Sequence, residues 1–243
     1  MDTILEVKNY SKEFNLHILN NKKIKALEHV SFSLKKGEII GLVGKSGSGK
    51  STLMKSIYRT YLASGGEIWY KSKLFGDVEM VGVGDHEVIS LRKKEITFCS
   101  QFLSVIPRIT AVDVVANNLI SRGVLQAEAR KRSAECLDAL GLPTELWDAY
   151  PSTFSGGEQQ RVNVAQAIIA SPRLLLIDEP TASLDPKTKD IVIDMILSLK
   201  KNNTSVLCIS HDSYTLNKMC DRLIELKDGK ILGETLVGIT SNN

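Results

Sequence analysis

A glycine-rich run in the first quarter of the chain has the residue types and spacing of a phosphate-binding loop. It reads Gly44-Lys45-Ser46-Gly47-Ser48-Gly49-Lys50-Ser51, and Thr52 follows it. Glycines allow successive backbone N–H groups to turn inward on phosphate oxygens, and a helix that starts at the end of the loop adds its positive dipole end. The G-x-x-x-x-G-K-[ST] pattern therefore predicts a nucleotide site, in which Lys50 neutralises the β- and γ-phosphates and the Ser51 hydroxyl reaches Mg²⁺.

Two carboxylates follow an apolar run in the second half of the chain. Residues 174–177 are all apolar, as in a parallel strand buried on both faces, and Asp178 and Glu179 come next. Ligands bind at the carboxyl ends of strands in open α/β sheets. Charged residues also mark many ordinary strand exits, so this inference depends on the phosphate loop being present as well. Together they predict that Asp178 holds Mg²⁺ through water and that Glu179 orients or deprotonates the attacking water.

A second anion-binding helix start is predicted at Ser155-Gly156-Gly157-Glu158. The Ser155 and Glu158 spacing also fits a capping box, which is a purely structural reading. Two successive glycines in a helix are nevertheless destabilising by roughly 1 kcal/mol each, and their bare backbone N–H groups suit a phosphate. Because the first loop already serves one nucleotide, this second site is expected to face a nucleotide held by another subunit.

Four further features could complete such a site, although Gln101, His211 and Phe14 each have an ordinary structural alternative. Gln101 follows an apolar strand, where its amide could reach Mg²⁺ or the attacking water. His211 is expected at the same sheet edge as Asp178, where it could bond the γ-phosphate and Glu179. Residues 183–185 could contact a partner's site, and Phe14 could stack on adenine or be a core residue.

Alternating strands and helices must position these residues. Strands are predicted at 4–7, 30–34, 38–43, 67–70, 96–100, 174–177 and 205–209. Helices are predicted over about 51–61, 157–170 and 186–201, and the pattern over about 102–153 is also helical. A polar excursion at 71–90 is expected to hold a short hairpin around 78–83, and Asp228-Gly229 is expected to join two final strands.

The overall composition is that of an ordinary globular protein. The 243 residues are 43% hydrophobic and 24% charged, and they fit one large α/β domain with an inserted lobe. A net charge of +3 is too small to indicate a nucleic-acid partner, and four cysteines without CxxC spacing are expected to be reduced core residues. No signal peptide and no apolar stretch of ~18 residues is found. We expect a soluble, cytoplasmic protein, so any membrane part must come from other chains.

In this order, the motifs resemble the ABC (ATP-binding cassette) ATPases over about residues 4–235. The resemblance implies an α/β P-loop NTPase core with an N-terminal antiparallel β subdomain and an inserted α-helical subdomain. A single ATP-binding domain would span 1–243, with the core at 1–101 and 159–243 and the helical signature subdomain at 102–158.

The resemblance also implies ATP and Mg²⁺ as cofactors, hydrolysis of ATP to ADP and phosphate, and a role for each motif. The implied motifs are Walker A at 44–51, the Q-loop at Gln101, the signature at 154–158, Walker B at 174–178, catalytic Glu179, the D-loop at 183–185, the switch histidine His211 and the adenine-stacking position at Phe14. A second ABC subunit, identical or different, would close head to tail on this one. The signature reads FSGGE where LSGGQ is usual, and Gln166 stands where arginine is common.

A closer resemblance, to the PhnL family of the phosphonate carbon–phosphorus lyase system, rests on residues 100–109, 146–147 and 151–163. That family works with soluble enzyme subunits that attach methylphosphonate to the ribose of a nucleoside triphosphate. It implies an accessory ATPase with soluble phosphonate-processing partners. Two alternatives remain, namely the motor subunit of a membrane transporter with permease partners and an ATP-gated interaction module.

Overall fold

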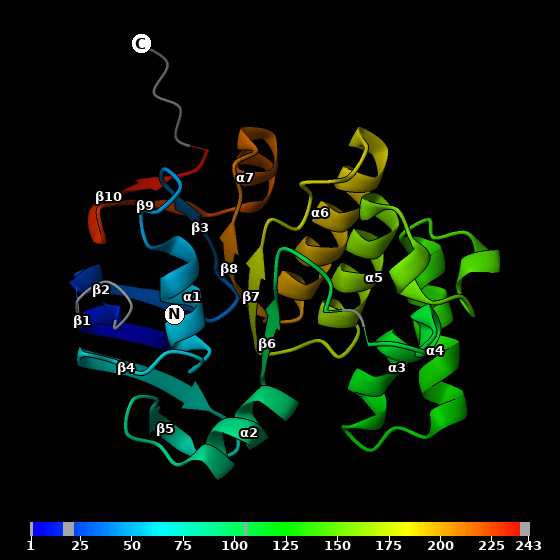
Figure 1. Cartoon of the computed structure of the whole chain (residues 1–243), viewed down its shortest axis with the longest axis horizontal. Coiled ribbons are helices and arrows are strands. Elements are labelled where there is room, and N and C mark those ends of the chain that lie inside the picture. The colour runs from blue at the N-terminus through cyan, green and yellow to red at the C-terminus, as the bar shows by residue number, and fades with distance from the viewer. Residues whose placement is uncertain (1, 17–21, 105, 239–243) are drawn as a thin grey trace.

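The structure is a computed structural model that describes residues 2–16, 22–104 and 106–238. Figure 1 shows two β-sheets on one side of the molecule and a group of helices on the other. The larger sheet has six strands in the order β10 (Lys230–Leu236), β9 (Arg222–Lys227), β3 (Ile39–Val43), β8 (Ser205–Ile209), β7 (Leu174–Asp178) and β6 (Ile96–Cys99). The five strands from β9 to β6 are parallel, and β10 is antiparallel to β9.

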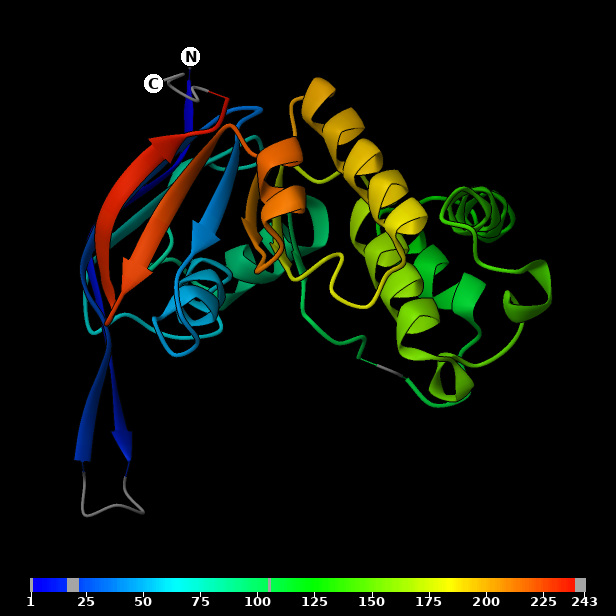
Figure 2. The same ribbon diagram turned by 90° about the horizontal axis from the view of Figure 1, so that it is seen from above.

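The smaller sheet is antiparallel and comes mostly from the N-terminal part of the chain. Its order is β2 (Lys22–Lys35), β1 (Thr3–Leu16), β4 (Gly65–Ser72) and β5 (Gly76–Glu79). The far ends of β1 and β2 extend from the body as a two-stranded ribbon (Figure 2). Both strands are much longer than the short runs at 4–7 and 30–34 predicted from sequence. The prediction was too short because register shifts between β1 and β2 interrupt the apolar alternation on which it relied.

Side chains of β7 alternate between two hydrophobic clusters, one on each face of the parallel sheet. Leu174 and Leu176 pack in a cluster with α1 (Lys50–Ile57) and residues of the antiparallel sheet. Leu175 and Ile177 pack in a second cluster with the helices on the opposite face. All five residues of β7 are buried, which confirms the predicted strand with both faces covered.

The remaining helices complete the α/β arrangement. They are α2 (Asp85–Lys94), α3 (Ala111–Ile120), α4 (Gln126–Ala139), α5 (Gly156–Ile168), α6 (Pro186–Lys201) and α7 (Ser213–Met219), with 3₁₀ turns η2 (Thr144–Leu146) and η3 (Pro151–Thr153). The helix predicted at 186–201 is confirmed, because Asp185 caps it by accepting from the Thr188 backbone N–H and Pro186 stands in its first turn.

Two local predictions were wrong. No hairpin lies around 78–83, because β5 pairs back with β4 across a turn that precedes Gly76. The helix α2 then follows, and it was missed because only Val88 and Leu91 on it are buried, which leaves a weak helical pattern. The first helix also ends at Ile57 rather than near residue 61, since Arg59 adopts a left-handed backbone with φ of 66°.

The helical segment at 102–158 contains α3 and α4, and α5 begins inside it at Gly156. Val162 and Ala165 of α5 pack in the same cluster as Leu175 of β7, so this helix bridges the segment and the parallel sheet. The division of the chain at 102 and 158 stays a prediction. All four cysteines are free and buried, as expected. No helix in the described ranges combines the length and apolar character that crossing a membrane requires.

Candidate nucleotide site

The glycine-rich loop leaves the carboxyl end of β3 and runs directly into α1, as its sequence context predicts. Gly44 and Gly49 have φ values of 141° and 107°, and both lie against backbone. A Cβ on Gly44 would come within 2.1 Å of the Leu226 carbonyl oxygen, and one on Gly49 within 2.7 Å of the Ala26 carbonyl oxygen. These two positions therefore need glycine for both conformation and space.

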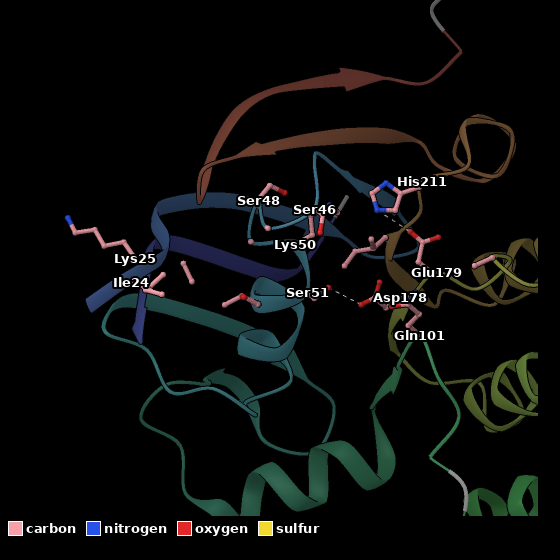
Figure 3. A pocket seen from close by; sticks show the side chains of 16 residues that line it. Ile24, Lys25, Ser46, Ser48, Lys50, Ser51, Gln101, Asp178, Glu179 and His211 are labelled. Atoms are coloured by element: carbon pink, nitrogen blue, oxygen red, sulfur yellow. Dashed lines mark hydrogen bonds and ion pairs between the residues drawn. The ribbon is translucent and has the colours of Figure 1, made fainter. Parts of the chain in front are cut away.

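The loop forms one wall of a cavity of about 580 Å³, whose opposite wall comes from the ends of β6, β7 and β8 (Figure 3). The sequence-predicted residues that line it are Ser46, Gly47, Ser48, Gly49, Lys50, Ser51, Thr52, Gln101, Asp178, Glu179 and His211. Residues from segments more than 150 positions apart thus share one cavity, because the parallel strands end at one edge.

The Ser51 hydroxyl donates to a carboxylate oxygen of Asp178 over 3.0 Å, at the point where the two walls meet. Burial raises the pKa of Asp178, while the Ser51 hydrogen bond and the Lys50 charge oppose that shift. The Lys50 ammonium donates to the carbonyl oxygens of Gly44 (2.6 Å) and Lys45 (3.1 Å). Lys50 is only 6% exposed, and this burial lowers its pKa although Asp178 and Glu179 act in the opposite direction.

Glu179 leaves β7 in a left-handed backbone conformation with φ of 53°. Its backbone N–H donates to the Ile209 carbonyl over 2.9 Å, which joins it to the end of β8. Its buried Oε1 atom has no hydrogen-bond partner among the described residues, and the His211 Nε2 atom lies 3.7 Å away. Burial raises the pKa of Glu179, while His211 and Lys50 oppose the shift. The result is a desolvated carboxylate with one free acceptor beside the cavity.

These residues fit Mg²⁺ bound together with a nucleotide. Within the described ranges, no group of three or more His, Cys, Asp or Glu side chains could hold a metal ion. Mg²⁺ is instead commonly bound by one or two protein oxygens together with substrate phosphates and water. Ser51 and Asp178 supply such oxygens at hydrogen-bond distance from each other, and Gln101 lines the same cavity. The buried hydroxyl of Ser48, another lining residue, has no hydrogen-bond partner among the residues that the structure describes, so it could accept a phosphate as partner.

Other sequence-predicted residues lie outside the cavity lining. Gly44 and Lys45 do not line the cavity, but their carbonyl oxygens accept hydrogen bonds from the Lys50 ammonium. Phe14 packs edge-on against Tyr61 with ring centroids 5.0 Å apart, and it does not line the cavity. Its adenine-stacking role therefore stays a prediction that the cavity geometry does not support directly.

The helix start at 155–158 is also absent from this cavity lining. Ser155 caps α5 through a capping box, in which its hydroxyl accepts from the Glu158 backbone N–H and the Glu158 carboxylate accepts from the Ser155 backbone N–H over 2.7 Å. That backbone hydrogen bond lowers the pKa of Glu158. A Cβ on Gly157 would lie 3.0 Å from the Ser183 carbonyl oxygen, so the glycine allows α5 to approach the segment at 183–185 closely. The structural reading of the motif is therefore confirmed, and the anion-binding reading remains open.

Sequence reasoning missed five lining residues. Three of them (Ile24, Lys25 and Ala26) come from β2 in the antiparallel sheet, and no local pattern connects them with the phosphate loop. Ala182 and Ile209 also line the cavity. The position of Ile209 could have been anticipated, because it ends β8 two residues before His211.

Comparisons with known proteins give a consistent result. A family model described as "ABC transporter" matches residues 27–182. The methionine import ATP-binding protein MetN of Carboxydothermus hydrogenoformans is 33% identical over 227 residues, which cover 93% of this chain but only 65% of that protein. The lipoprotein-releasing system ATP-binding protein LolD of Aquifex aeolicus is 36% identical, over 86% of this chain and 90% of LolD.

A solved structure has the same fold. The ATP-binding cassette MJ0796, described as a dimer in a post-hydrolysis state bound to ADP and Pi, superposes with a TM-score of 0.88. It is 31% identical and the match covers 96% of this chain and 99% of that one. This likeness confirms the expected α/β cassette fold.

Proposed function

The chain belongs to the ABC transporter family of ATP-hydrolysing, Mg²⁺-dependent cassettes, and from this we propose that it is the ATP-driven motor subunit of a membrane transporter. The observation that carries the ATP-hydrolysing part of the proposal is the single cavity in which the phosphate loop, Asp178, Glu179 and His211 meet. The relatives named above carry the names of a methionine importer and a lipoprotein-releasing system, and those names support a transport role.

In the proposed mechanism, this chain positions the triphosphate more than it reacts with it. Backbone N–H groups of the loop at 46–50 face the phosphates, and Lys50, already buried, neutralises charge that develops on them. Ser51, Asp178 and Gln101 would hold Mg²⁺, which when bound neutralises charge on the phosphate oxygens. Closure around this cavity excludes water other than the attacking molecule.

Glu179 is the proposed general base. Its free Oε1 atom can accept a hydrogen bond from the attacking water. Its raised pKa makes the carboxylate a stronger base, so it takes a proton from that water more readily. The His211 side chain, which is 63% exposed, faces Glu179 across 3.7 Å in the same cavity (Figure 3), where its imidazole can bond the γ-phosphate. In this step the water oxygen would bond to the γ-phosphorus, one water proton would pass to the Glu179 carboxylate, and the bond from the γ-phosphorus to the ADP oxygen would break, which releases ADP and phosphate.

We further propose that two cassettes close head to tail. Ser155 and Gly156 are exposed and the helix start at 155–158 lies outside the chain's own cavity lining, so the backbone N–H groups of its two glycines suit a nucleotide on a second cassette. The similar cassette MJ0796 was solved as a dimer, which supports this arrangement. Each nucleotide would then lie between the loop at 44–52 of one subunit and residues 155–158 of the other.

An accessory role in a soluble phosphonate-processing complex is the alternative implied by residues 100–109, 146–147 and 151–163. The transport names of the relatives weigh against it. The decisive experiment is a pull-down from native cells in MgATP with a tagged Glu179→Gln variant, analysed by mass spectrometry. The matched control is Lys50→Ala, which should not hold nucleotide.

Membrane permease subunits recovered with Glu179→Gln and reduced with Lys50→Ala would support the motor proposal. Soluble phosphonate-processing enzymes in their place would overturn it in favour of the alternative. Recovery of permease subunits in equal amounts with both variants would mean that partner binding does not depend on bound nucleotide. That result would contradict an ATP-dependent coupling step.

A further inference from the structure

Two buried amides on α5 contact the strand ends that carry the proposed catalytic groups. Gln160 and Asn163 are each 5% exposed and are three residues apart, so they lie on one face of the helix. The Gln160 side-chain amide donates to the carbonyl oxygens of Glu179 and Pro180, both over 3.1 Å. The Asn163 amide donates to the Ser100 carbonyl oxygen over 2.7 Å.

The Gln160 contact meets the backbone where it is strained. Glu179 has a φ of 53°, a left-handed conformation that costs free energy for a side-chain-bearing residue and persists only when its surroundings hold it. A primary amide has two N–H groups, and Gln160 directs them to two successive carbonyls of this turn. Both Glu179 and Pro180 are buried, so water cannot replace those hydrogen bonds cheaply.

The Asn163 amide likewise donates to a backbone carbonyl at the end of a strand, in this case the neighbouring strand β6. Ser100 directly follows β6, and its carbonyl belongs to the peptide group that joins it to Gln101. Gln101 lines the nucleotide cavity. One face of α5 therefore holds the backbone beneath both Glu179 and Gln101, although neither amide lines the cavity itself.

We propose that Gln160 is a positioning residue for Glu179 and that Asn163 is one for Gln101. In this way α5 would set the placement of both side chains in the cavity. The proposal rests on the roles given to Glu179 and Gln101 above. A displacement of about 1 Å at a reacting group is enough to lower turnover by up to about 100-fold, so loss of either amide should act on the chemical step.

The chain supplies a matched control in Gln159. Its amide also donates to two backbone carbonyls, those of Pro151 (3.1 Å) and Phe154 (3.2 Å), but these residues precede α5 and neither lines the nucleotide cavity. Replacing either glutamine by methionine keeps the length and removes the donors. If the amides only stabilise α5, Gln159→Met and Gln160→Met should lower turnover and melting temperature alike.

We expect Gln160→Met to lower kcat for ATP hydrolysis by about tenfold or more, with KM for MgATP changed by less than about threefold. Gln159→Met should keep kcat within about twofold of the parent chain. Gln160→Leu, which also lacks the N–H donors and stays uncharged but differs in shape from methionine, should match Gln160→Met and guards against a packing effect of methionine. Parent-like kcat in both Gln160 variants would overturn the proposal, and so would equal losses in Gln159→Met.

Hydrogen exchange gives a readout that does not depend on turnover. Gln160→Met should speed exchange of the backbone amides at 181–184, and Asn163→Leu should do so at 100–103, with the other segment unchanged in each case. A uniform increase along α5 in both variants would instead indicate loss of helix stability and would refute the positioning role. ATP hydrolysis by Glu179→Gln is measured in parallel. Full turnover in that variant would refute the role of Glu179 as the base, whereas the exchange result would still stand on its own.

Discussion

The Ser51 hydroxyl and the Asp178 carboxylate lie 3.0 Å apart although 127 residues separate them in the chain. Ser51 stands in the first turn of α1 and Asp178 ends β7, so their contact joins the phosphate loop to the strand that Glu179 directly follows. Because both residues present oxygen atoms at one point of the cavity, we propose that this contact marks the Mg²⁺ position.

A double-mutant cycle tests that pair. Ser51→Ala and Asp178→Asn should each weaken MgATP binding by about tenfold, which is about 1.4 kcal/mol. The double variant should fall short of the sum by about 1 kcal/mol or more, because the two residues share one partner. Nucleotide binding at varied Mg²⁺ measures this. A control cycle of Ser51→Ala with Asp138→Asn, on the exposed side of α4, should be additive within about 0.5 kcal/mol. Additivity in the Ser51–Asp178 cycle would argue against a shared metal.

Turnover should depend on the Glu179 carboxylate far more than nucleotide binding does. Glu179→Gln removes the proton acceptor while keeping the shape, so steady-state ATP hydrolysis should fall by about 100-fold or more while MgATP binding persists. Glu135→Gln on the exposed side of α4 is the matched control and should leave hydrolysis unchanged. Parent-like turnover in Glu179→Gln would rule out the assignment of this residue as the base.

The same variant should alter the pH dependence of stability. Burial holds the pKa of Glu179 in the folded protein above its ordinary value, so its contribution to stability is present at low pH and is lost as pH rises through the folded-state pKa. A glutamine at position 179 stays neutral at every pH, so the variant does not lose this stability as the pH rises. Glu179→Gln should therefore melt at a higher temperature than the parent at about pH 8, and the difference should shrink towards about pH 5. A difference that does not vary with pH would contradict the raised pKa.

Cooperative hydrolysis should require the helix start at Ser155. Ser155→Arg places a long, charged side chain in front of the α5 N-terminus, so it should leave nucleotide binding to the chain's own loop intact. The Hill coefficient for ATP should drop to about 1 if a second cassette can no longer close there. Gln126→Arg, at an exposed position of α4, should behave as the parent. Tight, cooperative closure by Ser155→Arg would count against the head-to-tail arrangement.

A buried carboxylate outside the site should matter for stability alone. Glu95, only 3% exposed, accepts hydrogen bonds from the Tyr70 and Ser72 hydroxyls and from the backbone N–H groups of Lys73 and Leu74. It thereby joins the β4–β5 turn to the start of β6. Glu95→Ala should lower the free energy of unfolding by about 3 kcal/mol, because those donors lose their partner. Urea denaturation measures this, and Glu135→Ala should stay within about 0.5 kcal/mol of the parent.

Several parts of this molecule could be predicted from patterns of residues that are close together in the sequence. The phosphate loop, the apolar run of β7 and the capped start of α6 at Asp185-Pro186 each depend on neighbouring residues in sequence, and the structure has all three. The expectation that strand ends converge also held, because parallel strands present their carboxyl ends at one edge. Asp178, Glu179 and His211 therefore could be predicted to share a site with the loop.

Other relationships were decided only when distant segments packed together. Ile24–Ala26 reach the cavity because the antiparallel sheet packs over α1, and Phe14 meets Tyr61 rather than the cavity lining. Gln160 looks like any polar residue of a helix, yet it donates to the strained turn at Glu179. The physical reason is that periodicity and turn chemistry act within a few residues, whereas a buried polar group takes whichever partner the packed core brings to it.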